Sequence, residues 1–362
     1  MPDNREGAPA QDRPVQEGKP IEMGCVQWGR DVDVALAKSH ETGKPVFLQF
    51  QELPGCLACQ QYGSGPLSHL LIVEAIEDCF IPVFVSNSTK GRDEATLKRF
   101  SEPAFNYPVA RFLTAEAEDI VSRNDKIWSQ PNKAARLAEQ MTAALEAHNR
   151  DVPPYLALMA ERPAQTETVV FAMHCYWVGE AKLGQLEGVL NTHSAWLQGK
   201  EVVEVEYDPT RLEYSALLWA AEKMECASTV FATSDEQSVI ANNMAKNTVV
   251  RLSETEKLRA AQDSDQKYYL RHSIYCHLPL TVAQSTKINA LLESKMAEDP
   301  AKQEAAILAL LSPRQIELFQ LVQKAKEASA DAFAAWVFPD DDAKLRRHYE
   351  GLHAAAMSIL AK

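Results

Sequence analysis

The sequence has little of several features that mark whole classes of protein. Among its 362 residues, no apolar run approaches the ~20 residues of a membrane-spanning helix. It has 37 Lys and Arg against 50 Asp and Glu, a formal charge of -13, and no basic stretch offsets that balance. Because nucleic-acid binding needs a basic face, we expect neither a nucleic acid nor a membrane as a partner.

Cysteine is also sparse, with seven residues in the chain. A low and odd number argues against a secreted disulfide scaffold and favours free thiols in a reducing compartment. Residues 1–20 are rich in Pro, Gly and polar residues and lack an apolar signal core, so we expect a disordered arm and a cytoplasmic protein. The remaining composition, with 46% hydrophobic residues, is that of a globular protein of about two domains.

The order of apolar segments predicts an α/β domain over residues 21–150. Short β-rich runs alternate there with helical periodicity, which predicts strands 46–50, 80–85 and 109–113 and helices 33–42, 70–77 and 134–147. Residues 151–166 are rich in proline and polar residues, which is typical of a linker.

A second α+β domain is predicted over residues 167–290. Its expected strands are 169–173, 201–207 and 272–276, and its expected helices are 176–190 and 212–224. Helical patterns dominate from residue 281 onward, and residues 291–362 are expected to form a helical C-terminal segment. Thr281 with Gln284, and Ser312 with Gln315, have the spacing of capping boxes that open helices.

The first candidate site is the pair Cys56 and Cys59, directly after the predicted strand 46–50. Two cysteines three residues apart on the first turn of a helix can close a small disulfide. The helix N-terminus favours the thiolate of the first cysteine, which is the nucleophile in thiol–disulfide exchange. A zinc half-site has the same spacing, but no second Cys-x-x-Cys or matched histidine pair lies nearby. Two unrelated buried cysteines are the remaining alternative.

This context resembles a known family. The strand, the stretch Pro-Gly-Cys-x-x-Cys at 54–59 and the stretch Asn-Tyr-Pro-Val at 106–109 are similar to the thioredoxin fold, in which a cis-proline faces the cysteine pair. Pro108 takes that place. The stretches 53–56 and 102–108 resemble more closely the thioredoxin-like selenoproteins named for a Val-Pro-Gly-Sec motif, with Cys56 where members often carry selenocysteine and Leu53 in place of the valine. The resemblance extends over a second domain.

The second candidate site is Cys175, which lies where a predicted strand leads into a predicted helix. Tyr176 and Trp177 follow it directly. The helix dipole activates a thiol at that position, and aromatic faces suit a methyl–sulfur group. A buried core cysteine beside aromatics is the alternative. Glu201 opens a strand on the face that also carries Val203, and a carboxyl held among apolar groups can stay protonated and donate a proton. A solvated strand-edge glutamate is the alternative there.

The stretch 174–180, His-Cys-Tyr-Trp-Val-Gly-Glu, resembles the Gly-Cys-Phe-Trp-Gly-x-Glu motif of the peptide methionine sulfoxide reductase A family. The resemblance implies a ferredoxin-like α+β domain with Cys175 as nucleophile, Glu201 as catalytic acid, and Tyr176 and Trp177 at the substrate. Counted back from Arg271, Asp265 takes the place of a site aspartate. This sequence has Leu270 where the family has a tyrosine, so Tyr268 or Tyr269 is the candidate replacement, and no cysteine follows Cys276.

Three hypotheses follow from these patterns. The first joins a thioredoxin-like reductant to a domain that reduces methionine S-sulfoxide in peptides or proteins through a Cys175 sulfenic acid, with an external thiol as reductant. The second confines redox chemistry to the cysteine pair and gives the other domain only binding of oxidised partners. The third treats both sites as vestigial in an interaction protein. The first accounts for most residues, and we expect no metal or cofactor, because the histidine spacings fit no familiar ligand pattern.

Overall fold

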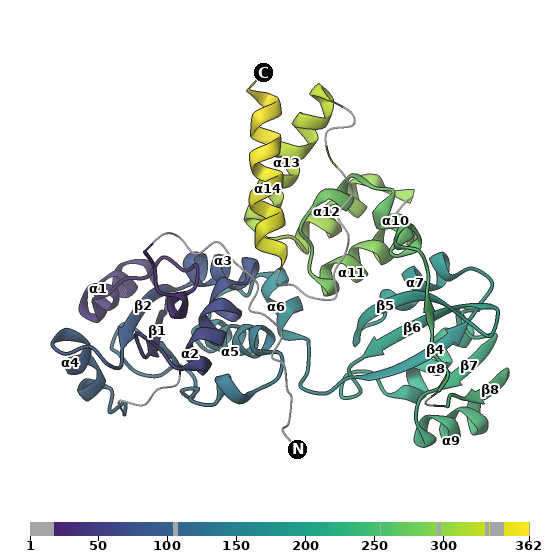
Figure 1. Cartoon of the computed structure of the whole chain (residues 1–362), viewed down its shortest axis with the longest axis horizontal. Helices are drawn as coiled ribbons and strands as arrows, with labels where there is room; N and C mark the ends of the chain where they lie inside the picture. The colour runs from purple at the N-terminus through teal and green to yellow at the C-terminus, as the bar shows by residue number, and fades with distance from the viewer. Residues whose placement is uncertain are drawn as a thin grey trace, which may run out of the picture.

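The computed structural model describes residues 18–103, 108–253, 255–294, 298–329, 333 and 344–361. Two lobes, each built around its own sheet, lie side by side, and a group of helices from the C-terminal part stands above them (Figure 1). The first lobe is purple to blue in Figure 1, the second is teal to green, and the last helix is yellow.

The first lobe has a three-stranded sheet in the order β2-β1-β3, with β1 parallel to β2 and antiparallel to β3. Its strands are β1 (Val46–Gln51), β2 (Ile81–Ser86) and β3 (Val109–Leu113). Its helices are η1 (Ile21–Met23), α1 (Val32–Thr42), α2 (Leu57–Ser64), η2 (Pro66–Ser68), α3 (Leu70–Cys79), α4 (Arg92–Arg99), η3 (Ile127–Ser129), α5 (Lys133–Ala147) and α6 (Pro154–Ala160).

Strand β1 is buried at every position because both of its faces are covered. Phe47 points into the cluster formed with α3, α5 and α6, whereas Leu48 and Phe50 point into the cluster formed with α1 and α4. Alternate side chains of a strand point to opposite faces, so two cores favour apolar residues on both faces, and Gln49 and Gln51 are the buried polar exceptions. Because β1 is held from both sides, it sets the position of the cysteine loop that follows it.

The second lobe has a six-stranded mixed sheet in the order β8-β7-β4-β6-β5-β9. Its strands are β4 (Glu167–Ala172), β5 (Val189–Leu197), β6 (Lys200–Tyr207), β7 (Thr229–Ala232), β8 (Thr248–Arg251) and β9 (Arg259–Ala260). Its helices are α7 (Tyr176–Gly184), α8 (Tyr214–Lys223), α9 (Asp235–Met244), η4 (Asp263–Asp265), α10 (Tyr268–Arg271) and η5 (Ile274–His277). Val203, Val205 and Tyr207 of β6 face the larger core of this lobe.

The C-terminal segment consists of α11 (Val282–Glu293), α12 (Pro300–Ala309), α13 (Pro313–Ala328) and α14 (Leu345–Leu360). Both predicted capping boxes are present, at Thr281 and at Ser312. Their two glutamines also join the helices, because Gln284 Nε2 donates to Gln315 Oε1 (2.8 Å) and Gln315 Nε2 donates to Gln284 Oε1 (3.0 Å).

Two predicted elements are wrong. The segment 272–276 is not a strand: it begins after α10 and forms most of η5, because Tyr275 stacks on Phe319 of α13 (4.8 Å between ring centroids) instead of joining a sheet. The helix expected over 176–190 ends at Gly184, and the strand β5 follows. Gly188 makes that turn with a φ of +83°, a conformation that favours glycine.

The expected linker 151–166 contains a helix. Tyr155, Leu156 and Met159 of α6 belong to the core of the first lobe, so the chain leaves that lobe only after Ala160. The helix α13 contacts the same lobe: the backbone N–H of Arg314 donates to Glu74 Oε1 (2.8 Å), and the Arg314 guanidinium pairs with Glu77 (2.7 Å).

Burial raises the pKa of Glu74 from its ordinary 4.5, although Ser312 and Arg314 lower it. The folded state therefore holds this proton more tightly than the unfolded chain, and the Glu74 contribution to stability falls as pH rises above about 4.5. We expect Glu74→Gln, which keeps an oxygen acceptor for the Arg314 N–H, to gain on the order of 1 kcal/mol at pH 7. The gain should shrink towards pH 4.5 in urea denaturation. An equal gain at both pH values would contradict the explanation by burial of the carboxylate. The control is Glu77→Gln, which removes the partly exposed partner of Arg314 and should lower stability at pH 7.

Candidate functional site

Cys56 is the N-cap residue of α2, where the chain leaves the buried strand β1 and enters a helix. Its Sγ lies 3.6 Å from Cys59 Sγ, so the two thiols are in contact but not bonded. A disulfide needs a sulfur–sulfur separation of about 2.05 Å, which a small side-chain movement supplies. The structure therefore holds a dithiol that is ready to close.

The two thiols differ in their surroundings. Cys56 is partly exposed and Cys59 is fully buried. Burial raises the pKa of Cys59 to about 12, against a smaller lowering by a hydrogen bond to the Glu52 backbone. Leu57 beside Cys56 is 69% exposed. An attacking thiol must meet its partner in solvent, so this arrangement favours Cys56 as the attacking residue and Cys59 as the resolving one.

The sequence analysis did not identify Glu22, which accepts a hydrogen bond from the backbone of the cysteine loop. Glu22 lies in η1 and is 3% exposed, and its Oε1 accepts a hydrogen bond from the Gly55 backbone N–H (2.7 Å). A Cβ at Gly55 would come within 2.7 Å of both Glu22 and Cys59, so only glycine fits between them. The signal in the sequence is an isolated glutamate between apolar Ile21 and Met23, which alone does not reveal a contact 33 residues along the chain.

Pro108 is buried immediately before β3. Val109 pairs with Phe50 near the end of β1, so the topology places Pro108 at the same edge of the sheet as the cysteine loop. The expected cis bond involves Tyr107, and residues 104–107 lie outside the described residues. A cis bond is present within the loop itself, between Leu53 and Pro54.

Cys175 is the N-cap residue of α7, and Glu201 lies beside it on β6. Strands β4 and β6 pair up to Ala172 and Val202, which brings the start of β6 to the end of β4. One oxygen of the Glu201 carboxyl group then accepts a hydrogen bond from the Tyr176 backbone N–H (2.9 Å). A carboxyl group thus lies at the first turn of the helix that carries the thiol.

Aromatic side chains gather around the first turn of α7, which follows this thiol. The Trp177 ring stacks on Tyr268 (4.0 Å between centroids, 15°), and Tyr176 meets Trp196 edge to face (5.8 Å). Met173 packs against Gly179 so closely that a Cβ at that glycine would lie 1.7 Å from the methionine sulfur. The close contact explains glycine on this face of α7.

Asp265 lies at the same site, because the Tyr176 hydroxyl donates to its Oδ2 (3.2 Å). Burial raises the pKa of Tyr176 to about 12, and Asp265 adds to the rise. Burial also raises the pKa of Tyr269, with smaller contributions from the charges of Glu293 and Cys175. Of the two tyrosines left open by the sequence, Tyr268 therefore stacks on Trp177, and Tyr269 is the one whose pKa the Cys175 charge affects.

Other groups that the sequence raised do not assemble into a site. Burial raises the pKa of Cys226 to about 11. Burial also raises the pKa of Cys276. Within the described ranges, no cluster of three or more His, Cys, Asp or Glu side chains suits a metal ion. The same ranges contain no helix long and apolar enough to cross a membrane.

Comparison with known proteins agrees with this fold. Residues 27–115 match a family model described as thioredoxin-like, so the first lobe is a thioredoxin-like domain, followed by the mixed sheet and a helical C-terminal segment, as the sequence predicts. The chain is also similar to proteins named peptide methionine sulfoxide reductase. One, form A5 from Oryza sativa subsp. japonica, is 38% identical over 72 residues, which are 16% of this chain and 28% of that protein.

This chain is also similar to two microbial proteins named peptide methionine sulfoxide reductase MsrA. The protein from Methanococcus maripaludis is 24% identical over 149 residues, 30% of this chain and 94% of that protein. The protein from Geobacter metallireducens is 34% identical over 77 residues, 17% of this chain and 47% of that protein. The chain thus spans about half or less of two of these three relatives.

The unequal burial of the cysteine pair leads to a direct test. Iodoacetamide at pH 7.5 should alkylate Cys56 at least about tenfold faster than Cys59, because a buried thiol of raised pKa is scarcely ionised. Mild oxidation before alkylation should protect both residues by forming a Cys56–Cys59 disulfide. Peptide mapping by mass spectrometry measures both results. Equal labelling of the two cysteines, with no bridge after oxidation, would rule out a redox-active pair.

Proposed function

We propose that the protein is a thiol–disulfide oxidoreductase whose cysteine pair reduces a second site, where Cys175 reduces methionine S-sulfoxide in peptides or proteins. The observation that carries the proposal is the hydrogen bond from the Tyr176 backbone N–H, directly after Cys175 on the first turn of α7, to the Glu201 carboxyl group of β6. Sulfoxide reduction needs a nucleophilic sulfur and a nearby acid, and both groups come from adjacent strand ends here. The partial likeness to three proteins named as methionine sulfoxide reductases supports the same chemistry.

In the proposed reaction, the Cys175 thiolate attacks the sulfoxide sulfur while Glu201 protonates its oxygen. The bond between Cys175 and the substrate sulfur and the sulfur–oxygen bond then break as the hydroxyl group passes to Cys175, so methionine leaves as the reduced thioether and Cys175 becomes a sulfenic acid. A second thiol attacks this sulfenic acid, forms a disulfide with Cys175 and releases water. The aromatic group around Trp177 is suited to the methyl–sulfur end of the substrate.

Cys56 is the proposed second thiol. Its attack gives a mixed disulfide with Cys175, and Cys59 then displaces Cys175 to leave a Cys56–Cys59 disulfide for an external thiol reductant. Cys226 and Cys276 are less suited, because both are buried. A cavity of about 410 Å³ lies between the lobes and is lined by residues such as His69, Lys133 and Val282, but its lining includes neither Cys56 nor Cys175. Transfer between these thiols would therefore follow another route, within one chain or between two.

An alternative function confines redox chemistry to the cysteine pair and leaves the second lobe to bind oxidised partners. The stack of Tyr268 on Trp177 favours this alternative, because it covers an aromatic face that a methyl–sulfur group would otherwise contact. Turnover of a methionine-sulfoxide peptide with a thiol reductant separates the two functions. Wild-type turnover that disappears in Cys175→Ser supports reduction, whereas peptide binding without turnover supports the alternative.

Glu201→Gln tests the assignment of the acid. Glutamine keeps an oxygen that can accept the Tyr176 N–H bond but has no acidic proton, so the turnover rate should fall about 10²- to 10⁴-fold. Peptide affinity should change little. Glu204→Gln, on the same strand, is the matched control and should turn over at the wild-type rate. A wild-type rate in Glu201→Gln would reject its role as proton donor.

The proposed order of thiols is tested with Cys59→Ser, which lacks the resolving thiol. After treatment with a sulfoxide peptide, this variant should accumulate a Cys56–Cys175 disulfide that peptide mapping detects. Non-reducing electrophoresis then separates a bond within one chain, which leaves a monomer, from a bond between two chains, which gives a covalent dimer. A trapped bond from Cys175 to Cys226 or Cys276 would show that the cysteine pair is not the reductant of this site.

A further inference from the structure

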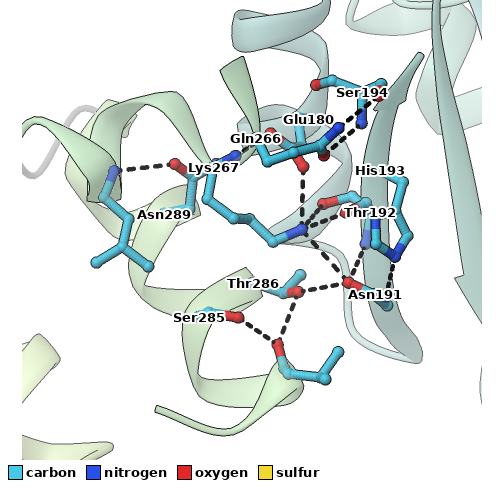
Figure 2. Close-up of polar contacts among 12 residues, drawn as sticks. Glu180, Asn191, Thr192, His193, Ser194, Gln266, Lys267, Ser285, Thr286 and Asn289 are labelled. Carbon is cyan, nitrogen blue, oxygen red and sulfur yellow. Dashed lines mark hydrogen bonds and ion pairs between the residues drawn. The ribbon is translucent and has the colours of Figure 1, made fainter. Parts of the chain in front are cut away.

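A buried ion pair lies beside the Cys175 site, between α7 and the residue before α10. Glu180 of α7 is fully buried and Lys267, just before α10, is 4% exposed. Lys267 Nζ lies 3.0 Å from Glu180 Oε1. Figure 2 shows the lysine reaching across to the glutamate, with its amine also directed at residues of β5.

The Lys267 ammonium is fully surrounded by oxygen acceptors. Besides Glu180, it donates to Thr192 Oγ1 (3.0 Å), to the Thr192 carbonyl and to Asn191 Oδ1 (3.3 Å). Thr286 of α11 donates to the same Asn191 oxygen (3.3 Å) (Figure 2). A buried charge is stable when it is paired and hydrogen-bonded, and this one joins α7, β5 and α11 at a single point.

The same carboxylate also holds the Lys267 backbone. The Lys267 N–H donates to Glu180 Oε2 (2.7 Å), so the two oxygens of Glu180 bind the two nitrogens of one residue. Lys267 has a φ of +50° and a ψ of +51°, a left-handed conformation that residues with a side chain rarely adopt. Backbone conformations of this kind persist where surrounding contacts fix them, as the Glu180 contacts do here.

The residues on either side of Lys267 are those that line the Cys175 site. Asp265 accepts from the Tyr176 hydroxyl, Tyr268 stacks on Trp177, and the pKa of Tyr269 responds to the Cys175 charge. Gln266 is fixed separately, because its side chain bonds both the N–H and the carbonyl of Ser194 (3.1 and 2.7 Å). We call residues 265–269 the covering segment.

We propose that Lys267, held by Glu180, is a positioning residue that sets the covering segment over the Cys175 thiol. For its effect on turnover, this inference rests on the proposed sulfoxide reduction. Glu180 stands on the helix whose N-cap is Cys175, so the pair ties the covering segment to the element that carries the nucleophile. A displacement of about 1 Å in an active site can lower the reaction rate on the order of 10²-fold. A small shift of the covering segment would therefore be enough to reduce turnover.

The pair contributes more to placement than to folding stability. Neutral residues of similar size often replace a buried ion pair without loss of stability, whereas removal of one partner leaves a buried charge alone. Lys267→Met alone is therefore expected to fold poorly. The informative variant is the neutral pair Glu180→Gln with Lys267→Met, in which the glutamine oxygen still accepts the residue-267 N–H but the ammonium and its bonds to β5 are gone.

The experiment compares wild type and this double variant in the full-length protein. We expect a similar melting temperature, a weaker near-ultraviolet circular dichroism signal from the Trp177–Tyr268 stack, and alkylation of Cys175 that is about threefold or more faster because its cover is looser. Turnover of a sulfoxide peptide should fall about tenfold or more through kcat. The matched control is Glu77→Gln with Arg314→Met, which makes the same kinds of replacement at an ion pair between α3 and α13. It should leave Cys175 alkylation and the aromatic circular dichroism signal unchanged.

Wild-type Cys175 alkylation and aromatic circular dichroism in a folded double variant would overturn the inference. So would an equal change in the control, which would indicate a general effect of lost stability. Because these two measurements need no sulfoxide, they test the positioning of Cys175 even where wild type shows no turnover. An absence of wild-type turnover alone would reject the proposed function and not the placement of the segment.

Discussion

A charge that leaves water must find a partner, and this constraint organises the second lobe around Glu180. The carboxylate is fully buried on α7, and Lys267 supplies a positive charge together with two nitrogen donors. Neither residue can move far without exposing a bare charge to an apolar interior, at a cost of several kcal/mol. The distance between α7 and α10 is therefore fixed, and this keeps the Trp177 ring of α7 stacked on the Tyr268 ring of α10.

The two cysteine sites use the same local device for different ends. In each lobe a buried strand ends and the next helix begins at a cysteine, so the thiol lies at a helix N-terminus. In the first lobe a second, buried thiol lies 3.6 Å from the cysteine sulfur. In the second lobe the Glu201 carboxyl group accepts a hydrogen bond from the residue that follows the cysteine. The surroundings of the two thiols differ because the neighbouring strand or turn brings a different side chain to the same kind of helix end.

Local signals predicted local structure well. The apolar run at 46–50 and the capping boxes at Thr281 and Ser312 need only neighbours within a few residues, and all three are present. The false strand at 272–276 arose because Ile274, Tyr275 and Cys276 form a short run of hydrophobic residues, whereas Tyr275 packs on α13, some 40 residues later. A short hydrophobic run alone does not distinguish a strand from a turn of helix packed against another helix.

The candidate site was predictable only in part for the same physical reason. Cys56, Cys175 and Glu201 stand in motifs, so pattern and resemblance found them. Glu22 and Lys267 act through contacts 33 and 87 residues distant, and each looks in sequence like an ordinary surface charge. Lys267 lies between Gln266 and Tyr268, and this local sequence has no apolar pattern that predicts a buried position. Only the folded chain shows that these charges are inside.

The helical segment has one strong and one weak attachment. Towards the second lobe, Asn289 accepts from the Leu270 N–H and Thr286 joins the Lys267 network, all within buried surroundings. Towards the first lobe, the Arg314–Glu77 pair is partly exposed, which limits its contribution to about 1 kcal/mol or less. Leu345 adds one fully buried side chain to that contact, about 1.5–3 kcal/mol, and the hydrogen bonds from the Arg314 N–H to Glu74 and from Arg346 to the Ser68 carbonyl add about 0.5–1.5 kcal/mol each.

This difference bears on how the two thiol sites would meet. The free energy of the weaker contact is smaller than the 5–15 kcal/mol that typically holds a domain folded. Release of α13 and α14 from the first lobe therefore costs less than unfolding either lobe. The Cys175 site stays whole in such a movement, because its own ties to α11 are the buried ones. Separation of the lobes at this contact is thus a rearrangement that would leave intact the geometry that each thiol needs while Cys56 gains access to Cys175.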